Sequence, residues 1–382
     1  MVSRILLLST ILPVAMAGRA DGQETAVQRQ LQDAIAAEQR GDWQAAEKTY
    51  SSILKLHPQR ADVMVRLGLV YQHRGRLEPA VDAIRSALTL DPELPGAHFY
   101  LGLAYFGLRG YAEAAGVLQE AISRDPENVK AQVHLGACFL ALGRVDESIG
   151  HLEELTRVHP RELEALQTLA QAYLTKGNDD GFNRTIARVD EVEPDSFRSQ
   201  QLRAEFFAAR RRLSEAAQAY EKAAARNPNA PGVNFALGDI YFELGEYDKA
   251  EPALRKELRI DPHHPIVNLE LGIINNSRRR FDQAIRHLET ALRADGRLTD
   301  AYVALASAFV AKGRLPAAEG ALRRAIALAP RDPQPYYELA QVFRKLGRME
   351  DARASLERFQ RLEEEENQER QRAAEGLLHS NP

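Results

Sequence analysis

The hydrophobic pattern of the chain is helical and periodic. Between residues 27 and 366, apolar and small residues recur at spacings of three and four, which places them on one stripe of an amphipathic helix. Leu67, Gly68 and Tyr71 form one such stripe, and Leu101 and Gly102 repeat it 34 residues later. The pattern predicts an all-α protein built from short helices that pack on one another.

Turn residues recur with the same 34-residue period. One series of prolines has a single gap, which Gly296 fills, and consists of Pro58, Pro92, Pro126, Pro160, Pro194, Pro228, Pro262 and Pro330. A series of glycines falls between the prolines, at Gly41, Gly75, Gly143, Gly177, Gly245, Gly313 and Gly347. Because proline and glycine both favour helix ends, the two series predict two helices in each of ten units that begin at Val27 and run to residue 366.

The eighth place of every unit is glycine or alanine, and the twentieth place is alanine in most units. Glycine inside a helix costs about 1 kcal/mol relative to alanine, so its repeated use suggests that the second helix approaches closely. We therefore expect the small residue of one helix to face the small residue of the other.

These residues together resemble the tetratricopeptide repeat. The order is Leu, Gly or Ala, and Tyr or Phe, followed by the turn Gly, the Ala of the second helix and the Pro, and it covers nearly all of the chain. The resemblance implies a right-handed superhelical α-solenoid of about ten helix–turn–helix repeats with a C-terminal capping helix. It also implies a surface that binds another molecule.

The amino terminus resembles a secretory signal peptide. Arg4 precedes the apolar stretch from Ile5 to Ala17, which ends in the small-x-small sequence Ala15-Met16-Ala17. We expect residues 1–17 to be removed, or alternatively residues 1–20, and the protein to be periplasmic or secreted. The stretch is too short for a stable membrane span, which needs about 20 apolar residues, although an uncleaved anchor is the alternative.

The remaining chain divides into three parts. We expect residues 18–26 to be a disordered linker, residues 27–366 to form the ten repeats, and residues 367–382 to extend the capping helix and end in a disordered tail.

The family resemblance also implies where a partner would bind. In tetratricopeptide repeats the first helices line a concave groove, and their second, fifth, ninth and twelfth places point into it. The apolar residues at these places are Val65, Leu69, Phe99, Leu103, Phe106, Val133, Leu140, Phe235, Phe242, Leu269, Ile273, Val303 and Val310. We expect the four phenylalanines to contribute most, since large aromatic side chains dominate interfaces. The alternative is that these side chains belong to the core.

Two arginine triplets are candidate secondary contacts for a phosphate group or an acidic glycan. They lie in the turns of repeats six and eight, at Arg210, Arg211 and Arg212 and at Arg278, Arg279 and Arg280. The alternative is that they are solvated turn residues.

Repeat five departs from the pattern, because Phe182 replaces the small residue of the twentieth place and Asn178 to Gly181 change the turn. We expect either a flexible joint in repeats five and six or simple compensation, in which Phe182 fills space elsewhere.

Composition limits the chemistry. The formal net charge of −4 argues against nucleic acid as a partner. Cys138 is the only cysteine, so no internal disulfide can form, and we expect it to be buried. His263 and His264 are adjacent and lack the helical spacing of a zinc site, and no catalytic or cofactor-binding motif is present. We therefore expect no enzyme activity, no cofactor and no metal.

The sequence thus predicts a non-catalytic scaffold that binds a protein or peptide in its concave groove, in envelope or secretory assembly. The alternative is a regulatory or accessory subunit of an envelope enzyme or transporter, which binds through its edges and arginine turns. Neither the partner nor the oligomeric state follows from the sequence.

Overall fold

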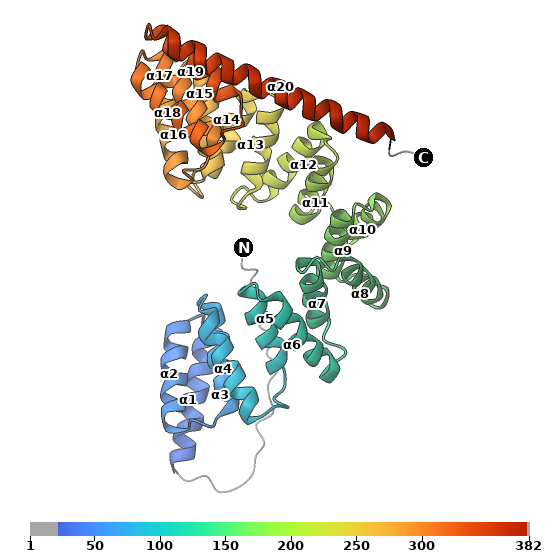
Figure 1. Ribbon diagram of the computed structural model, residues 1–382. Helices are drawn as coiled ribbons and strands as arrows, with labels where there is room; N and C mark the ends of the chain where they lie inside the picture. Colours follow the sequence, from blue (N-terminus) through green and yellow to red (C-terminus); the bar gives the residue numbers. More distant parts are fainter. Residues whose placement is uncertain (1–21, 380–382) are drawn as a thin grey trace. The chain divides into compact units, whose positions relative to one another are not determined.

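The computed structural model describes the backbone of residues 22–379 and the side chains of residues 26–372. Within this part of the chain there are twenty α-helices, which pack as consecutive pairs (Figure 1). The predicted all-α repeat fold is confirmed. The predicted signal peptide lies outside the described residues.

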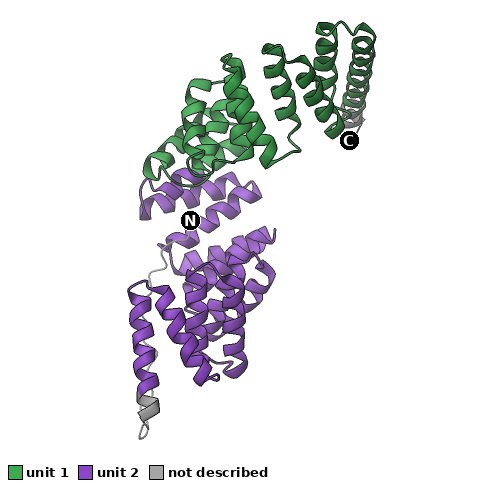
Figure 2. Ribbon diagram, turned by 90° about the vertical axis from the view of Figure 1, so that its left-hand side faces the viewer, with its two compact units in different colours: residues 1, 203–382 green, residues 2–202 purple. Residues whose placement is uncertain are grey.

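The helices belong to two compact units, which we describe separately: an N-terminal unit that ends at Leu202 and a C-terminal unit that begins at Arg203 (Figure 2). The helices of the N-terminal unit are α1 (Gly22–Gln39), α2 (Trp43–Leu56), α3 (Ala61–His73), α4 (Leu77–Leu90), α5 (Ala97–Gly107), α6 (Tyr111–Arg124), α7 (Val129–Ala141), α8 (Val145–Val158), α9 (Leu163–Lys176) and α10 (Asp179–Val192). Helix α11 (Phe197–Ala209) contains the boundary. The helices of the C-terminal unit are α12 (Leu213–Arg226), α13 (Val233–Glu243), α14 (Tyr247–Glu257), α15 (Pro265–Ser277), α16 (Phe281–Ala294), α17 (Thr299–Ala311), α18 (Leu315–Leu328), α19 (Gln334–Lys345) and α20 (Met349–His379).

The helical glycines allow a large side chain, rather than a small one, to reach the first helix. A Cβ atom added to Gly136 would lie 2.7 Å from two carbon atoms of Leu152, in the second helix of the same repeat. The same clash would occur in four other repeats, in the pairs Gly68–Ile84, Gly102–Leu118, Gly238–Leu254 and Gly272–Leu288. The close approach was predicted, but its assignment to a facing alanine is corrected: the residue that fills the space is the leucine or isoleucine at place twenty-four.

The turns inside the repeats use the left-handed conformation that glycine adopts at little cost. The seven predicted turn glycines have φ angles between 70° and 76°. Three repeats place an arginine there instead, and Arg109, Arg211 and Arg279 have φ angles of 61°, 57° and 58°. The central residue of each arginine triplet is therefore backbone-strained.

The two ends of the described chain are helical. Helix α1 begins at Gly22, so residues 22–26 are not the disordered linker that the sequence predicts. Helix α20 continues through the last predicted repeat to His379, and Figure 1 shows it as the longest helix. Among its described side chains, which end at residue 372, the last buried one is Leu362, and residues 363–372 are exposed. This part of the helix is stabilised by interactions within the helix itself, because side chains of opposite charge on neighbouring turns attract one another.

The unusual residues of repeat five fit together without an irregular turn. Gly177 ends α9 with a φ of 76°, and the Asn178 side chain accepts a hydrogen bond of 2.9 Å from the Gly181 N–H at the start of α10. Gly181 makes room for the ring of Tyr173, and Phe182 is only 1% exposed. These contacts favour the compensation interpretation over a flexible joint at residues 177–182.

Candidate protein-binding surfaces

An aromatic cluster lies on the first helices of repeats three and four and at the start of α6, the second helix of repeat three. The imidazole of His134 on α7 meets the rings of Phe99 and Phe106 on α5 edge to face, with ring centroids 6.2 and 5.5 Å apart. Phe106 also meets Tyr111 at 5.3 Å. The Nδ1–H of His134 donates to the backbone carbonyl of Lys130 at 2.9 Å, which holds the ring on its helix. All four rings of this aromatic cluster are half-buried, so each has apolar surface left for a partner.

Most of the predicted groove residues are half-buried. Three of the thirteen are core residues instead, since Val65, Val133 and Leu269 are 7%, 5% and 8% exposed. Their prediction as partner contacts is corrected, because these side chains are enclosed by neighbouring helices. The other ten form what we call the first-helix face: Leu69, Phe99, Leu103, Phe106 and Leu140 in the N-terminal unit, and Phe235, Phe242, Ile273, Val303 and Val310 in the C-terminal unit. Several of them also pack against the core, so this face combines a structural and a surface role.

The first-helix face of the C-terminal unit contains carboxyl groups that sequence reasoning did not single out. Glu270 on α15 is 4% exposed, and its Oε2 atom has no hydrogen-bond partner. Burial, a hydrogen bond with Asp239 and the nearby charges of Asp239 and Glu243 raise the pKa of Glu270 to about 9. The signal in the sequence was a glutamate placed between Leu269 and Leu271 in an apolar stretch.

The arginine turns are largely engaged within the C-terminal unit. Arg278 forms ion pairs with Asp248 and Glu251 of the preceding repeat, and Arg280 also reaches Glu251, at 3.5 Å. Arg211 pairs with Glu243 at 3.0 Å.

The remaining triplet residues are also accounted for. Arg212 pairs with Glu215 at 2.8 Å and covers the ring of Phe207, while Arg210 covers the ring of Phe206. Among the described residues Arg279 has no ion-pair partner, and it is exposed.

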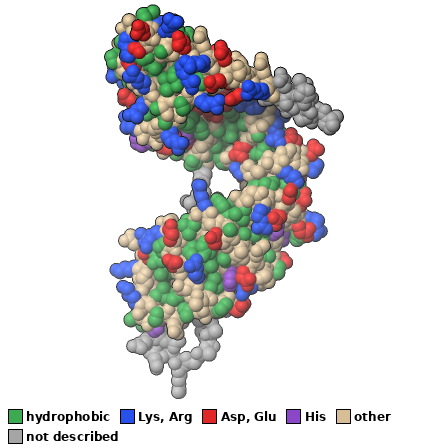
Figure 3. All heavy atoms as spheres, viewed as in Figure 1, with side chains coloured by type: hydrophobic (Ala, Val, Ile, Leu, Met, Phe, Trp, Pro, Cys, Tyr) green, Lys and Arg blue, Asp and Glu red, His purple; other side chains and the backbone are tan. Residues whose placement is uncertain are grey.

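A recurring contact explains several of the arginines outside the triplets. In repeats two, four, nine and ten, the arginine that follows the turn lies over the aromatic ring at place eleven of the first helix, at 4.4 to 4.7 Å from the ring centroid. Such cation–π contacts stabilise the turn and occupy the arginine. On the face drawn in Figure 3, positive and negative side chains are intermixed, so neither sign dominates that surface.

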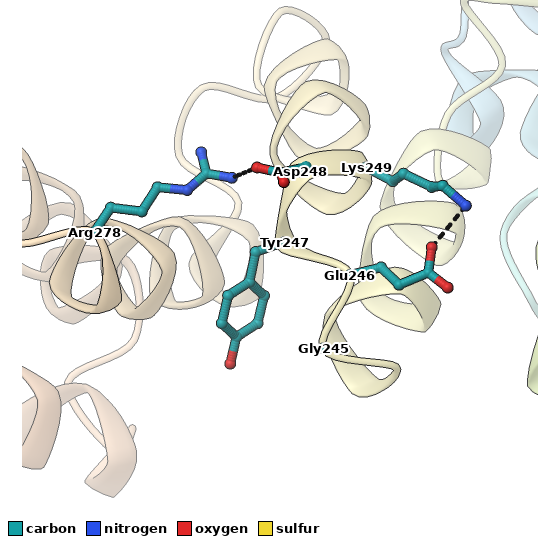
Figure 4. A pocket seen from close by; sticks show the side chains of 6 residues that line it. All are labelled: Gly245, Glu246, Tyr247, Asp248, Lys249 and Arg278. Carbon is teal, nitrogen blue, oxygen red and sulfur yellow. Dashed lines mark hydrogen bonds and ion pairs between the residues drawn. The ribbon is translucent and has the colours of Figure 1, made fainter.

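A shallow depression of about 450 Å³ lies beside the turn between α13 and α14 (Figure 4). It is lined by Gly245, Glu246, Tyr247, Asp248, Lys249 and Arg278. Its charged groups pair with one another, Arg278 with Asp248 and Lys249 with Glu246, as the dashed lines in Figure 4 show. This pairing leaves no charged group of the depression free to define a small-molecule site.

The other candidate reactive residues have structural roles. Cys138 is fully buried, and burial raises the pKa of its thiol to about 11, which keeps it unreactive. The Nδ1 atom of His264 accepts from the Val267 N–H at 3.3 Å and so caps α15, and its ring packs on Phe235. Within the described residues, no group of three or more His, Cys, Asp or Glu side chains is arranged to hold a metal ion. None of the helices described here is both long and apolar enough to cross a membrane.

Two family models match adjoining stretches of the chain. The model described as "Tetratricopeptide repeat" matches residues 31–95, 99–154 and 139–182, where the paired helices and turn glycines lie. The chain is a tetratricopeptide repeat protein. The model described as "Cilia and flagella-associated protein 70 C-terminal domain" matches residues 204–375, in the C-terminal unit. Tetratricopeptide repeats generally serve as scaffolds for protein interactions, and no enzyme family was found.

Solved structures share this fold at low sequence identity. The structure of a monomeric IFIT1 mutant with Gppp-AAAA is 17% identical over 90% of this chain and 82% of its own, with a TM-score of 0.52. The human IFIT1 dimer with m7Gppp-AAAA is also 17% identical, over 86% of this chain and 80% of its own, with a TM-score of 0.51. A crystal structure of MamA is 24% identical over 44% of this chain and 91% of its own, with a TM-score of 0.41. A search of curated proteins gave no match.

Proposed function

We propose that this tetratricopeptide repeat protein is a non-catalytic scaffold that holds an apolar segment of a partner protein against its first-helix face. The observation that carries the proposal is the aromatic cluster of Phe99, Phe106, Tyr111 and His134, whose rings are held in place and remain partly exposed. Aromatic side chains bury much apolar area at a small entropic cost, which makes such a cluster a suitable binding centre.

An amphipathic helix or an extended segment would complete the burial of these rings. Burying apolar surface contributes about 25 cal/mol per Å², so a few half-buried rings supply a useful part of a binding free energy. The neighbouring half-buried residues Leu69, Leu103 and Leu140 extend the surface along the N-terminal unit.

The experiment compares three full-length proteins: wild type, Phe99→Glu/Phe106→Glu, and Leu90→Glu as the matched control. Leu90 is 46% exposed on the second helix of repeat two, so its change places a glutamate, with one of the two added charges, away from the first-helix face. Partners are isolated by affinity co-purification from the native source and quantified by mass spectrometry, and each recovered partner is then tested as a purified protein.

We expect a partner that wild type and Leu90→Glu retain and that the double phenylalanine variant loses by at least about tenfold, which corresponds to 1.4 kcal/mol. Circular dichroism establishes that the variant is folded, and Phe99→Ala/Phe106→Ala serves as the milder variant. Equal recovery of all partners by the folded variants would disprove a role for the aromatic cluster.

The alternative, an accessory subunit that binds through its arginine turns, has less support. Arg211, Arg278 and Arg280 already pair with carboxylates of the same protein, so a partner would have to replace those contacts. Substitution of Arg279 by glutamate provides the test: loss of the partner from this variant, with retention by the phenylalanine variant, favours the alternative.

The cellular setting is a separate part of the proposal. The residues before Ala17 support export to an envelope or secretory assembly, whereas the description of the family model that matches residues 204–375 suggests a ciliary one. Intact-mass measurement of the protein from its native source distinguishes them. A mass that lacks residues 1–17 or 1–20 supports export, and a mass that includes them removes this support.

A further inference from the structure

Among the described residues, each buried glutamate except one is held by an arginine or by a backbone N–H group. Glu38, Glu251 and Glu319 are 8%, 8% and 9% exposed, and each of them forms an ion pair with at least one arginine. Glu257 is 3% exposed and accepts a hydrogen bond from the Gly232 N–H at 3.1 Å. Burying a carboxylate is costly unless it is paired or hydrogen-bonded, and these four follow that rule.

Glu270 differs from these four in the kind of partner it has. At 4% exposure it is as deeply buried as the others, and its Oε2 atom has no hydrogen-bond partner, as is also true of one oxygen each in Glu38 and Glu257. The hydrogen bond that Glu270 does make is to another carboxyl group, that of Asp239. Among the described residues, no Lys, Arg or His forms an ion pair with Glu270 or with Asp239. The groups that face it are instead the carboxyls of Asp239 and Glu243, on the neighbouring first helix α13. Asp239, Glu243 and Glu270, which we call the carboxylate cluster, would therefore repel one another if all three were ionised.

Within the described residues, the carboxylate cluster forms one ion pair with a cation, and this pair lies at its edge. Arg211 pairs with Glu243 at 3.0 Å, where the two side chains are 73% and 37% exposed, so water screens this pair. Burial, the hydrogen bond with Asp239 and the charges of Asp239 and Glu243 raise the pKa of Glu270 to about 9, so Glu270 keeps its proton at neutral pH.

The surroundings of the carboxylate cluster are apolar. On α13, Phe235 lies one turn before Asp239 and Phe242 lies nearly one turn after it, and both rings are half-buried. On α15, Ile273 lies nearly one turn after Glu270 and is also half-buried. The cluster therefore interrupts the first-helix face of the C-terminal unit at one point.

We propose that the carboxylate cluster receives one lysine or arginine side chain of the partner segment that lies on the first-helix face of the C-terminal unit. The aliphatic stem of the cation would lie against Phe235 and Phe242, and its charged end would reach Asp239 and Glu270. The cation would supply the charge that arginines of this protein supply to Glu38, Glu251 and Glu319. A metal ion fits less well, because the described residues contain no group with metal-binding geometry. This inference rests on the proposed function and specifies the chemistry of the segment.

The test uses a random twelve-residue peptide library displayed on phage, selected on immobilised full-length protein. We expect the selected sequences to contain one lysine or arginine among apolar residues. The best peptide is then synthesised with that residue unchanged, exchanged between lysine and arginine, or replaced by norleucine, which keeps the stem and removes the charge. Fluorescence anisotropy measures each Kd.

The same peptides are measured on two variants. Asp239→Asn/Glu270→Gln removes the charges with little change in shape, and Glu338→Gln is the control, since Glu338 occupies the equivalent sixth place of repeat ten. We expect norleucine to weaken binding at least about tenfold on wild type and on Glu338→Gln, and less than about threefold on Asp239→Asn/Glu270→Gln.

The outcomes separate the inference from the proposed function. If the selected peptides are lost on a Phe235→Ser variant but bind equally well with lysine or norleucine, the face binds peptides and the cation inference is wrong. If the norleucine effect persists undiminished on Asp239→Asn/Glu270→Gln, the cation binds elsewhere and the inference is again wrong. If wild type retains no peptide above an unrelated control protein, both the inference and peptide binding by this face fail. Circular dichroism checks the fold of each variant.

Discussion

The close approach of the helices at Gly136 leads to a prediction that opposes helix propensity. In an open helical position, a change from glycine to alanine stabilises by about 1 kcal/mol. At Gly136 the new Cβ atom would lie 2.7 Å from Cγ and Cδ2 of Leu152, whereas carbon atoms normally lie about 3.5–4.0 Å apart. Leu152 is fully buried and cannot move aside freely, so we expect overpacking to cost about 1–3 kcal/mol. Gly136→Ala should therefore leave stability unchanged or lower it by up to about 2 kcal/mol.

The matched control is Gly150→Ala in α8, the second helix of the same repeat. No atom lies within 4 Å of the position that its Cβ would take, and the site is exposed, so only the gain in helix propensity of about 1 kcal/mol remains. The two substitutions make the same chemical change in one repeat. Their difference of about 1–3 kcal/mol measures the contact with Leu152 directly.

Urea unfolding of the full chain, followed by circular dichroism, gives the two midpoints. Because the stability of a solenoid is close to a sum of local terms, hydrogen exchange of the α7 and α8 amides shows whether the effect arises in this repeat. Gly136→Ala combined with Leu152→Ala should be less destabilised than the sum of the single variants, because the smaller side chain makes room for the new methyl group. If Gly136→Ala stabilises the protein as much as Gly150→Ala does, the argument for close packing at this glycine is wrong.

The remaining predictions concern charge, backbone strain and burial. The pKa of Glu270 is raised from 4.5 to about 9, so between these pH values the folded state binds more protons than the unfolded state. The free energy of unfolding should therefore fall as pH rises from about 5 to 9, by up to ~1.4 kcal/mol per pH unit. Glu270→Gln should remove this dependence, and urea midpoints at several pH values measure it; an unchanged pH profile would contradict the assignment. Arg279→Gly should stabilise by up to about 1 kcal/mol, because glycine adopts the φ of 58° without strain, and a lower thermal midpoint would count against this. The Cys138 thiol should react with a disulfide reagent only as fast as the protein opens, so rapid labelling of the native protein would show that it is not buried. Arg66 forms an ion pair with the buried Glu38, so Arg66→Gln should destabilise the protein by about 1–2 kcal/mol at pH 7. The loss should be smaller at pH 4, where the Glu38 carboxyl is protonated, and equal losses at both pH values would refute a role for this ion pair.

The sequence predicted most of the fold because the information that specifies it is local and repeated. The proline and glycine series limit helix length through backbone geometry alone, and the apolar spacing decides which side of each helix is buried. The ten units, the helix pairs and the small eighth place followed from these signals. At the amino terminus, where no such signal marks a boundary, the prediction of a disordered linker over residues 18–26 was wrong for residues 22–26.

The candidate surfaces depended more on tertiary structure. Sequence spacing placed Val65, Val133 and Leu269 on the same stripe as Leu69 and Phe99, but only packing decides which side chains of a stripe are enclosed. Likewise, the sequence suggested that an alanine faces each helical glycine, whereas the structure gives that place to a leucine or isoleucine. The spacing of a helical stripe shows which side of the helix a side chain lies on only to within about one residue position. Neighbouring positions on that side differ between core and surface contacts, so the spacing does not separate the two.

The charged residues also separate what the sequence determines from what the tertiary structure decides. The sequence by itself determined that this is a helical repeat protein with mixed charges and no recognisable catalytic motif. Only the tertiary structure decided that most of the triplet arginines are engaged within the protein and that Glu270 forms no ion pair with any cation of the part of the chain described here. The reason is that an ion pair joins residues about thirty positions apart in neighbouring repeats, and the repeat pattern does not record which side chains meet across that interface.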